Sequence, residues 1–263
     1  MNIIHPTLNL DWLQRNCTGR GTVVAVVDSG VDARHPDLQG KVRRACLVQK
    51  DAQGEIRFQE LPGEESPDSY GHGTAVAGVI LNLAPQAEIV SVKVLNEYNQ
   101  CTGQELIAGL KWALDQKIKL INMSLATAKK QFVPELMALC EQANTQETII
   151  VAARRNFGDI GWPAVFSSVI TVDREDFPDK FLLRYYPQNI IDFGAAGYNL
   201  RLPSLHGGYS LLTGTSFATP HITGMIALLL EVFPGLLPAE AKTILKALSA
   251  DTIREIHRPP LDP

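Results

Sequence analysis

Five short apolar runs constrain the fold of this chain more than any other sequence feature. They are rich in valine and isoleucine and continuously apolar rather than alternating, at residues 22–27, 89–94, 120–123, 148–151 and 169–172. This pattern is typical of parallel strands that are buried on both faces. Between them, residues 104–116 and 134–143 carry apolar side chains at helical spacing. The alternation predicts an α/β domain with right-handed crossovers.

Two longer helices are predicted towards the C-terminal end. Residues 216–233 are apolar almost all round, which is typical of a buried helix, and a proline and a glycine follow them. Residues 238–249 begin with a proline and carry Glu240 in the first turn, as helices often do. We expect residues 250–263 to form an irregular tail. Nearer the start, Gln53-Gly54 between apolar runs predicts a hairpin.

Charge and hydropathy exclude several kinds of partner. The 24 basic and 28 acidic residues give a net charge of −4 without a basic tract, so a nucleic-acid groove is not expected. The longest apolar stretch, 222–230, is far shorter than the ~20 residues that a membrane-spanning helix needs. Residues 1–10 do not resemble a secretory signal, which predicts a cytoplasmic protein; removal of a leader from a secreted protein would leave the same sequence. Nothing indicates an oligomeric state.

The four cysteines are widely spaced and form no C-x-x-C pair, at Cys17, Cys46, Cys101 and Cys140. Three pairings are possible and the sequence chooses none of them. We expect free thiols in a reducing compartment, and the spacing disfavours zinc ligation.

Three short motifs carry residues suited to catalysis. The first apolar run ends at Asp28, where open α/β sheets place functional groups, although aspartate also favours turns. His72 lies between two glycines in residues 71–78 (GHGTAVAG), and histidine suits proton transfer near neutral pH. Ser216 lies in residues 213–220 (TGTSFATP) at the start of the long helix, where it is a capping residue or a nucleophile.

Taken together and in this order, the three motifs resemble those of the subtilisin-like serine peptidases. Smaller matches at residues 35–38 (HPDL), 92–95 (VKVL) and 121–125 (INMSL) extend the resemblance over about residues 19–248. It implies one peptidase domain over residues 1–263, with a core at 19–249. The implied fold is a three-layer, doubly wound and mostly parallel sheet flanked by helices.

The resemblance also implies roles. Ser216 would attack the scissile carbonyl, His72 would transfer the proton, and Asp28 would orient and stabilise the imidazole. Asn156, which follows the run at 148–151, matches the asparagine of the family's oxyanion hole, with the backbone N–H of Ser216 as second donor. The implied activity is that of a serine endopeptidase, and we expect it to act inside the cell or in the maturation of a precursor.

Substrate would add as an extended strand beside Ser124, Leu125 and Ala126, and the S1 pocket would lie between this segment and Ala153 and Arg155. Relatives commonly have Ala-Gly where this chain has Arg154-Arg155. Either these arginines turn to solvent, or one guanidinium binds an acidic group of the substrate.

The segment at residues 80–85 is short where many secreted relatives have a longer calcium-binding loop. We therefore expect no strong calcium site, no other metal site and no cofactor, and the sequence does not decide whether calcium binds weakly. The charged segment at 173–188 has no assigned role.

Three other functions remain as alternatives. A peptide ligase or macrocyclase would use the same acyl-enzyme, but it needs water excluded and no large insertion is present to do so. A non-catalytic binding module would be indicated by loss of a triad residue, and all three are present. A dinucleotide-dependent oxidoreductase would need G-x-G-x-x-G after the first strand, where this chain has Asp28-Ser29-Gly30.

Overall fold

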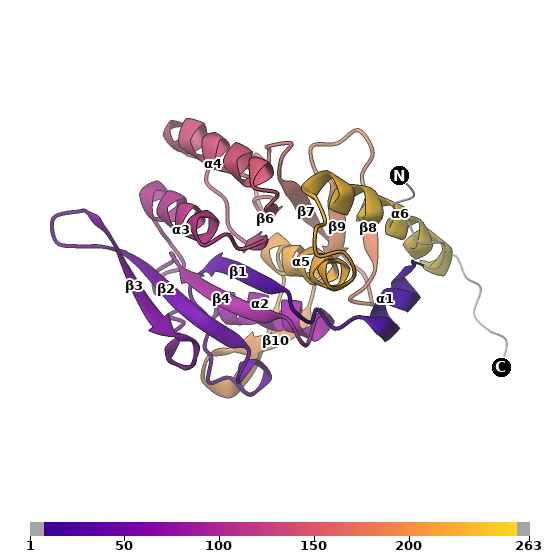
Figure 1. The fold of residues 1–263 in the computed structure, drawn as a ribbon, viewed down its shortest axis with the longest axis horizontal. Coiled ribbons are helices and arrows are strands. Elements are labelled where there is room, and N and C mark those ends of the chain that lie inside the picture. Colours follow the sequence, from indigo (N-terminus) through magenta and orange to yellow (C-terminus); the bar gives the residue numbers. More distant parts are fainter. Residues whose placement is uncertain (1–7, 257–263) are drawn as a thin grey trace.

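The computed structural model describes residues 8–256, with side chains through residue 249. A nine-stranded sheet in the order β3-β2-β4-β1-β5-β6-β7-β9-β8 forms its centre (Figure 1). The strands are β1 (Val23–Asp28), β2 (Val42–Lys50), β3 (Ile56–Pro62), β4 (Glu88–Lys93), β5 (Leu120–Met123), β6 (Ile149–Ala153), β7 (Ile170–Glu175), β8 (Leu183–Tyr185) and β9 (Phe193–Ala196). All neighbours pair in parallel except the two edge pairs, β2 with β3 and β8 with β9.

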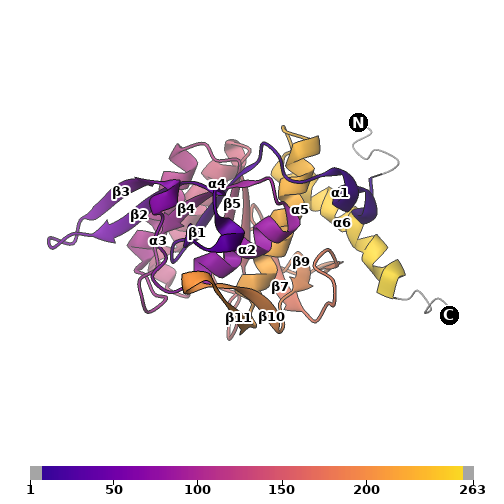
Figure 2. The same ribbon diagram turned by 90° about the horizontal axis from the view of Figure 1, so that it is seen from below.

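Helices cover both faces of the sheet and make a three-layer structure (Figures 1 and 2). One face is covered by α2 (His72–Leu83) and α5 (Thr215–Val232), with α1 (Leu10–Asn16) and α6 (Pro238–Ile256). The other is covered by α3 (Gly103–Asp115) and α4 (Val133–Thr145). In β1, Val24 and Val26 contribute to the first core and Ala25 and Val27 to the second. A strand buried on both faces must be apolar at every position, which explains the continuous runs in the sequence.

A two-stranded ribbon of β10 (Leu200–Ser204) and β11 (Gly208–Leu212) lies beside α2 (Figure 2). Gly78 permits this contact, because an ideal Cβ there would lie 2.6 Å from the ring of Pro203. Among the described residues, no helix is long and apolar enough to cross a membrane.

The α/β fold, the five parallel strands and the hairpin are as predicted, and α5 is buried along most of its length. The predicted irregular tail at 250–263 differs in part from the structure. Helix α6 continues to Ile256, seven residues beyond the predicted end, because neither proline nor glycine interrupts residues 250–256. Residues 257–263 lie outside the described part of the chain.

Candidate active site

The strand β1 delivers Asp28 to its carboxyl end, where the side chain is fully buried. Its Oδ1 accepts hydrogen bonds from the backbone N–H of Ser29 and from Nδ1 of His72, each at 2.7 Å. Its Oδ2 is also buried and has no hydrogen-bond partner among the described residues. This carboxylate is therefore held beside the imidazole and away from water.

Two glycines allow the start of α2 to approach the end of β1. Gly71 has a φ of +97°, in the left-handed region that favours glycine. An ideal Cβ on Gly73 would lie 2.0 Å from the carbonyl oxygen of Gly30 and 3.1 Å from the Cβ of Asp28. Only a residue without a side chain fits there, so the Gly-His-Gly motif sets the distance between the imidazole and Asp28.

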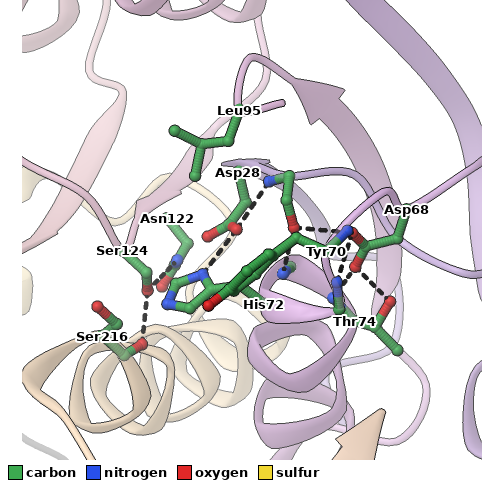
Figure 3. Close-up of polar contacts among 12 residues, drawn as sticks. Asp28, Asp68, Tyr70, His72, Thr74, Leu95, Asn122, Ser124 and Ser216 are labelled. Carbon is green, nitrogen blue, oxygen red and sulfur yellow. Dashed lines mark hydrogen bonds and ion pairs between the residues drawn. The ribbon is translucent and has the colours of Figure 1, made fainter. Parts of the chain in front are cut away.

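His72 is 10% exposed at its side chain and lies between Asp28 and Ser216 (Figure 3). The ring of Phe217 packs against it, with centroids 5.1 Å apart. Burial alone lowers the pKa of this imidazole, but the charge and hydrogen bond of Asp28, together with the charge of Asp68, outweigh it and raise the pKa above 6.5. The site therefore favours the imidazolium that forms when His72 takes up a proton.

Asp68 was missed by the sequence analysis, because it lies in a segment rich in acidic residues. Its carboxylate accepts hydrogen bonds from the hydroxyls of Ser29 and Thr74 and from the backbone N–H groups of Tyr70, Gly71 and Thr74 (Figure 3). It thus joins the end of β1 to the first turn of α2. A negative charge at a helix N-terminus is also favourable.

Ser216 lies in the first turn of α5, where backbone N–H groups have no partner within the helix. Its carbonyl oxygen accepts a hydrogen bond from Ser124 Oγ at 2.7 Å, and Ser124 is held in turn by Asn122 Nδ2 at 3.0 Å. No hydrogen bond joins the Ser216 hydroxyl to His72 in the described structure. Such contacts often tighten only when substrate binds.

The side chain of Asn156 follows β6 and faces the same site. Its Oδ1 accepts hydrogen bonds from the backbone N–H of Thr215 at 3.1 Å, from the Thr215 hydroxyl at 3.3 Å and from Nη1 of Arg174 at 2.8 Å. With Oδ1 held by these donors, the amide Nδ2 is left to donate towards the cleft. Arg174 itself lies over the ring of Tyr198 and donates to the Tyr198 hydroxyl at 3.0 Å.

A cleft of about 520 Å³ contains His72, Ser216 and Asn156 in its lining. The residues predicted to bind substrate also line it: Ser124, Leu125, Ala126, Ala153 and Arg155. Cys101 lies in the same lining, but burial and the charge of Glu105 raise the pKa of its thiol to about 12. It is therefore a neutral thiol near pH 7 and does not compete with Ser216 as a nucleophile.

The two neighbouring arginines lie differently. Arg154 points to Asp173, with Nη1 3.5 Å from Oδ2, and its Nε donates to the carbonyl oxygen of Arg155 at 3.0 Å. The side chain of Arg155 instead extends over Gly161. The Arg154 side chain is thus paired within the protein, and both arginines line the cleft.

Two other histidines are structural. His35 is buried and its Nε2 lies 2.9 Å from the carbonyl oxygen of Gly208. His221 is buried in α5, with Nδ1 2.9 Å from the carbonyl oxygen of Phe217. Over the described residues, no three His, Cys, Asp or Glu side chains gather as metal ligands would.

Comparison with known proteins agrees with this geometry. The model of the Subtilase family matches residues 19–257. An "Intracellular serine protease" of Paenibacillus polymyxa is 32% identical over 230 residues, which cover 81% of this chain and 68% of that protein. "Subtilisin E" of Bacillus subtilis (strain 168) is 31% identical over 234 residues, and the match covers 82% of this chain and 57% of that protein.

Among solved structures, the "Crystal structure of a cold adapted subtilisin-like serine proteinase" superposes with a TM-score of 0.70 at 25% identity. The match covers 88% of this chain and 83% of that one. The family match spans most of the chain and includes the three motifs that contain Asp28, His72 and Ser216. The chain therefore belongs to the subtilase family and is a subtilisin-like serine protease.

Proposed function

We propose that this chain cleaves bonds within peptides or proteins through an acyl-enzyme on Ser216. The observation that carries the proposal is the hydrogen bond of 2.7 Å between Asp28 and His72, in a cleft that also contains Ser216 and Asn156. These residues come from β1, α2, α5 and the end of β6, so only the folded chain brings them together.

In the first step, Ser216 Oγ attacks the scissile carbonyl carbon and His72 Nε2 takes the hydroxyl proton. The carbonyl oxygen becomes an oxyanion, which receives hydrogen bonds from Asn156 Nδ2 and the backbone N–H of Ser216. His72 then gives the proton to the leaving amine as the carbon–nitrogen bond breaks. Water then attacks the acyl-enzyme while His72 takes its proton, and His72 gives this proton to Ser216 Oγ as the acyl–oxygen bond breaks and the acid product leaves. Asp28 remains a carboxylate and stabilises the imidazolium throughout.

Substrate is proposed to bind as an extended strand along residues 124–126. In the described structure, the backbone groups of Leu125 and Ala126 make no hydrogen bonds, whereas Thr127 pairs with Trp162 at 2.8 and 2.9 Å. A free strand edge in a catalytic cleft suits main-chain recognition of a peptide. The hydroxyl of Ser124 is already used by the carbonyl oxygen of Ser216, so it positions the nucleophile rather than the substrate.

The cell interior is the proposed place of action, with precursor maturation as one role to be tested there. The support is the relatives' printed names: both the Paenibacillus polymyxa protein and the "Major intracellular serine protease" of Bacillus subtilis (strain 168) are 32% identical to this chain. Fractionation of the native host tests the location, and detection in the medium alone would contradict it.

Calcium is proposed to be unnecessary for this protease. The turn from α2 to β4 is short, with only residues 84–87 between Leu83 and Glu88. If so, a chelator leaves both activity and melting temperature unchanged, whereas a chelator-sensitive enzyme would contradict the proposal.

A fluorophosphonate probe tests the function directly, because it reacts with an activated serine. We expect labelling of the native protein, none of Ser216→Ala and none of heat-denatured protein. Peptide hydrolysis should be lost in the same variant. Labelling that survives Ser216→Ala, or a folded native protein that neither labels nor cleaves peptides, would contradict the proposal.

A further inference from the structure

We propose, building on the protease function above, that this enzyme selects a carboxylate side chain at P1, the substrate residue before the scissile bond, and that Arg155 binds it. The proposal rests on where the Arg155 side chain lies, on its lack of a partner and on the charge of the cleft.

The space for the P1 side chain lies between two walls beside Ser216. One wall is formed by residues 124–127 and the other by residues 153–156, and both line the cleft. Residues 160–162 join them. The backbone N–H of Arg155 donates to the carbonyl oxygen of Ile160 at 2.8 Å, and Thr127 pairs with Trp162. This segment therefore closes the space between the walls.

The side chain of Arg155 extends over the closing segment. An ideal Cβ on Gly161 would lie 2.7 Å from both Cγ and Cδ of Arg155, and 3.2 Å from the carbonyl oxygen of Thr127. An ideal Cβ on Gly158 would lie 3.7 Å from the guanidinium Nη1. The arginine stem thus lies against Gly161, in space that a side chain at this position would fill, and its guanidinium lies near Gly158.

The Arg155 guanidinium has no partner among the side chains that the structure describes. No ion pair or side-chain hydrogen bond of Arg155 occurs within residues 8–249, whereas Arg154 is paired with Asp173. A partly buried cation without a carboxylate is unfavourable, and a planar guanidinium can bind a carboxylate through two parallel hydrogen bonds. A substrate carboxylate at P1 would supply the missing partner.

The charge of the cleft favours the same substrate. Of the basic residues in its lining, Arg154 is paired with Asp173, whereas Lys129 and Arg155 form no ion pair among the described residues. No aspartate or glutamate of the described residues lines the cleft. A lysine or arginine at P1 would meet like charge. A large apolar side chain would compete for space with the Arg155 stem and would desolvate its guanidinium without compensation.

The decisive experiment compares matched peptides that differ only at P1, with Glu and Gln as the main pair and Asp, Leu and Lys beside them. Glu and Gln have the same shape, so the ratio of their kcat/KM values isolates the charge. We expect a Glu/Gln ratio of about 10 to 100 in the native enzyme, the range for one hydrogen-bonded charge pair. Arg155→Gln should bring the ratio close to one, and Arg155→Lys should lower it partly.

Arg154→Gln is the matched control, because it removes the neighbouring arginine, and there the ratio should stay within about twofold of the native value. A native ratio near one overturns the inference, as does a ratio that survives Arg155→Gln. If that variant fails to fold, the comparison of Arg155→Lys with Arg154→Gln decides instead, and an equal effect of the two contradicts the proposal.

Fluorophosphonate labelling separates this inference from the proposed function. If Ser216 is labelled but peptides with Glu and Gln at P1 are cleaved equally well, the P1 assignment is contradicted and the protease function still stands. Absence of labelling and of all cleavage removes both.

Discussion

At the scale of single residues, Arg174 holds the Asn156 side chain in place. Arg174 Nη1 donates to Asn156 Oδ1 at 2.8 Å, and the stacking on Tyr198 fixes the guanidinium. We predict that Arg174→Ala lowers kcat about tenfold with little change in KM, because the oxyanion forms only after substrate is bound. Thr215 still contacts Oδ1, so the loss should be smaller than for removal of Asn156 itself. Steady-state kinetics on one good peptide measures it.

Arg174→Lys should recover part of the lost rate, since it keeps a donor and a charge. Arg184→Ala is the control. Arg184 lies on the edge strand β8 and pairs with Glu175 at 3.4 Å, so its removal also breaks an arginine ion pair but does not touch Asn156. A change confined to KM, or an equal loss in the Arg184 variant, would show that Arg174 does not position the amide.

The pH dependence of activity depends on Asp68 as well as on Asp28. His72 must be neutral to accept the serine proton, so kcat/KM should rise with pH through a midpoint above 6.5. The charge of Asp68 is one cause that raises the pKa of His72, so Asp68→Asn should move the midpoint to lower pH. Glu64→Gln, an exposed acid from the same segment, serves as control. A midpoint that stays fixed or rises in Asp68→Asn contradicts the assignment.

The sequence predicted the residues proposed to carry out the reaction better than the residues that hold them in place. Asp28, His72 and Ser216 lie in short local motifs of small residues, and these motifs have few other uses. Asp68 and Arg174 lie in charged segments that look like solvated surface. Their partners are distant in sequence, since Arg174 contacts Asn156 and Asp68 contacts Ser29. Such contacts are decided by the packing of elements, which local patterns do not encode.

At the scale of elements, the contact between β1 and α2 sets the site geometry. We predict that Gly73→Ala destabilises the protein by about 1–3 kcal/mol and reduces activity more than stability alone explains, because the added methyl would lie 2.0 Å from a carbonyl oxygen. Gly235→Ala is the matched control, since an ideal Cβ there meets no atom within 4 Å. Urea unfolding and kinetics at a temperature where both variants are folded test this. Equal behaviour of the two variants would contradict it.

The elements that the sequence predicted best are those with long or continuous apolar patterns. The central strands and α5 are apolar because both sides of them are covered, and this leaves a continuous signal. The strands β8, β9, β10 and β11 are three to five residues long and were not predicted. The strands β5 and β6 are equally short but consist mostly of large apolar residues, whereas β8 to β11 are interrupted by arginine, glycine, proline or serine.

At the scale of the whole molecule, the buried His221 should make stability fall in mild acid. Burial, followed by the smaller effect of nearby Lys180, lowers the pKa of His221 to about 4 in the folded protein, although hydrogen bonds to Phe217 and Ala218 and the charge of Asp179 oppose the shift. The unfolded chain takes up this proton near 6.5, the ordinary value. The contribution of the neutral imidazole to the free energy of unfolding is therefore fully present above about pH 6.5. It is lost progressively as the pH falls towards 4.

The raised pKa of His72 acts in the opposite sense, because its contribution is present below 6.5 and is lost as the pH rises through the folded value. Between pH 7.5 and 5, His221 alone should account for a loss of about 2 kcal/mol in the free energy of unfolding. In His221→Gln, which cannot titrate, this part of the pH dependence should disappear even if the variant is less stable at every pH. The measured quantity is the difference between urea unfolding free energies at the two pH values.

The control is His206→Gln, which replaces an exposed histidine and should retain the native difference. An unchanged difference in His221→Gln would show that the interior does not exclude the charged imidazole, and that acid sensitivity arises elsewhere in the fold.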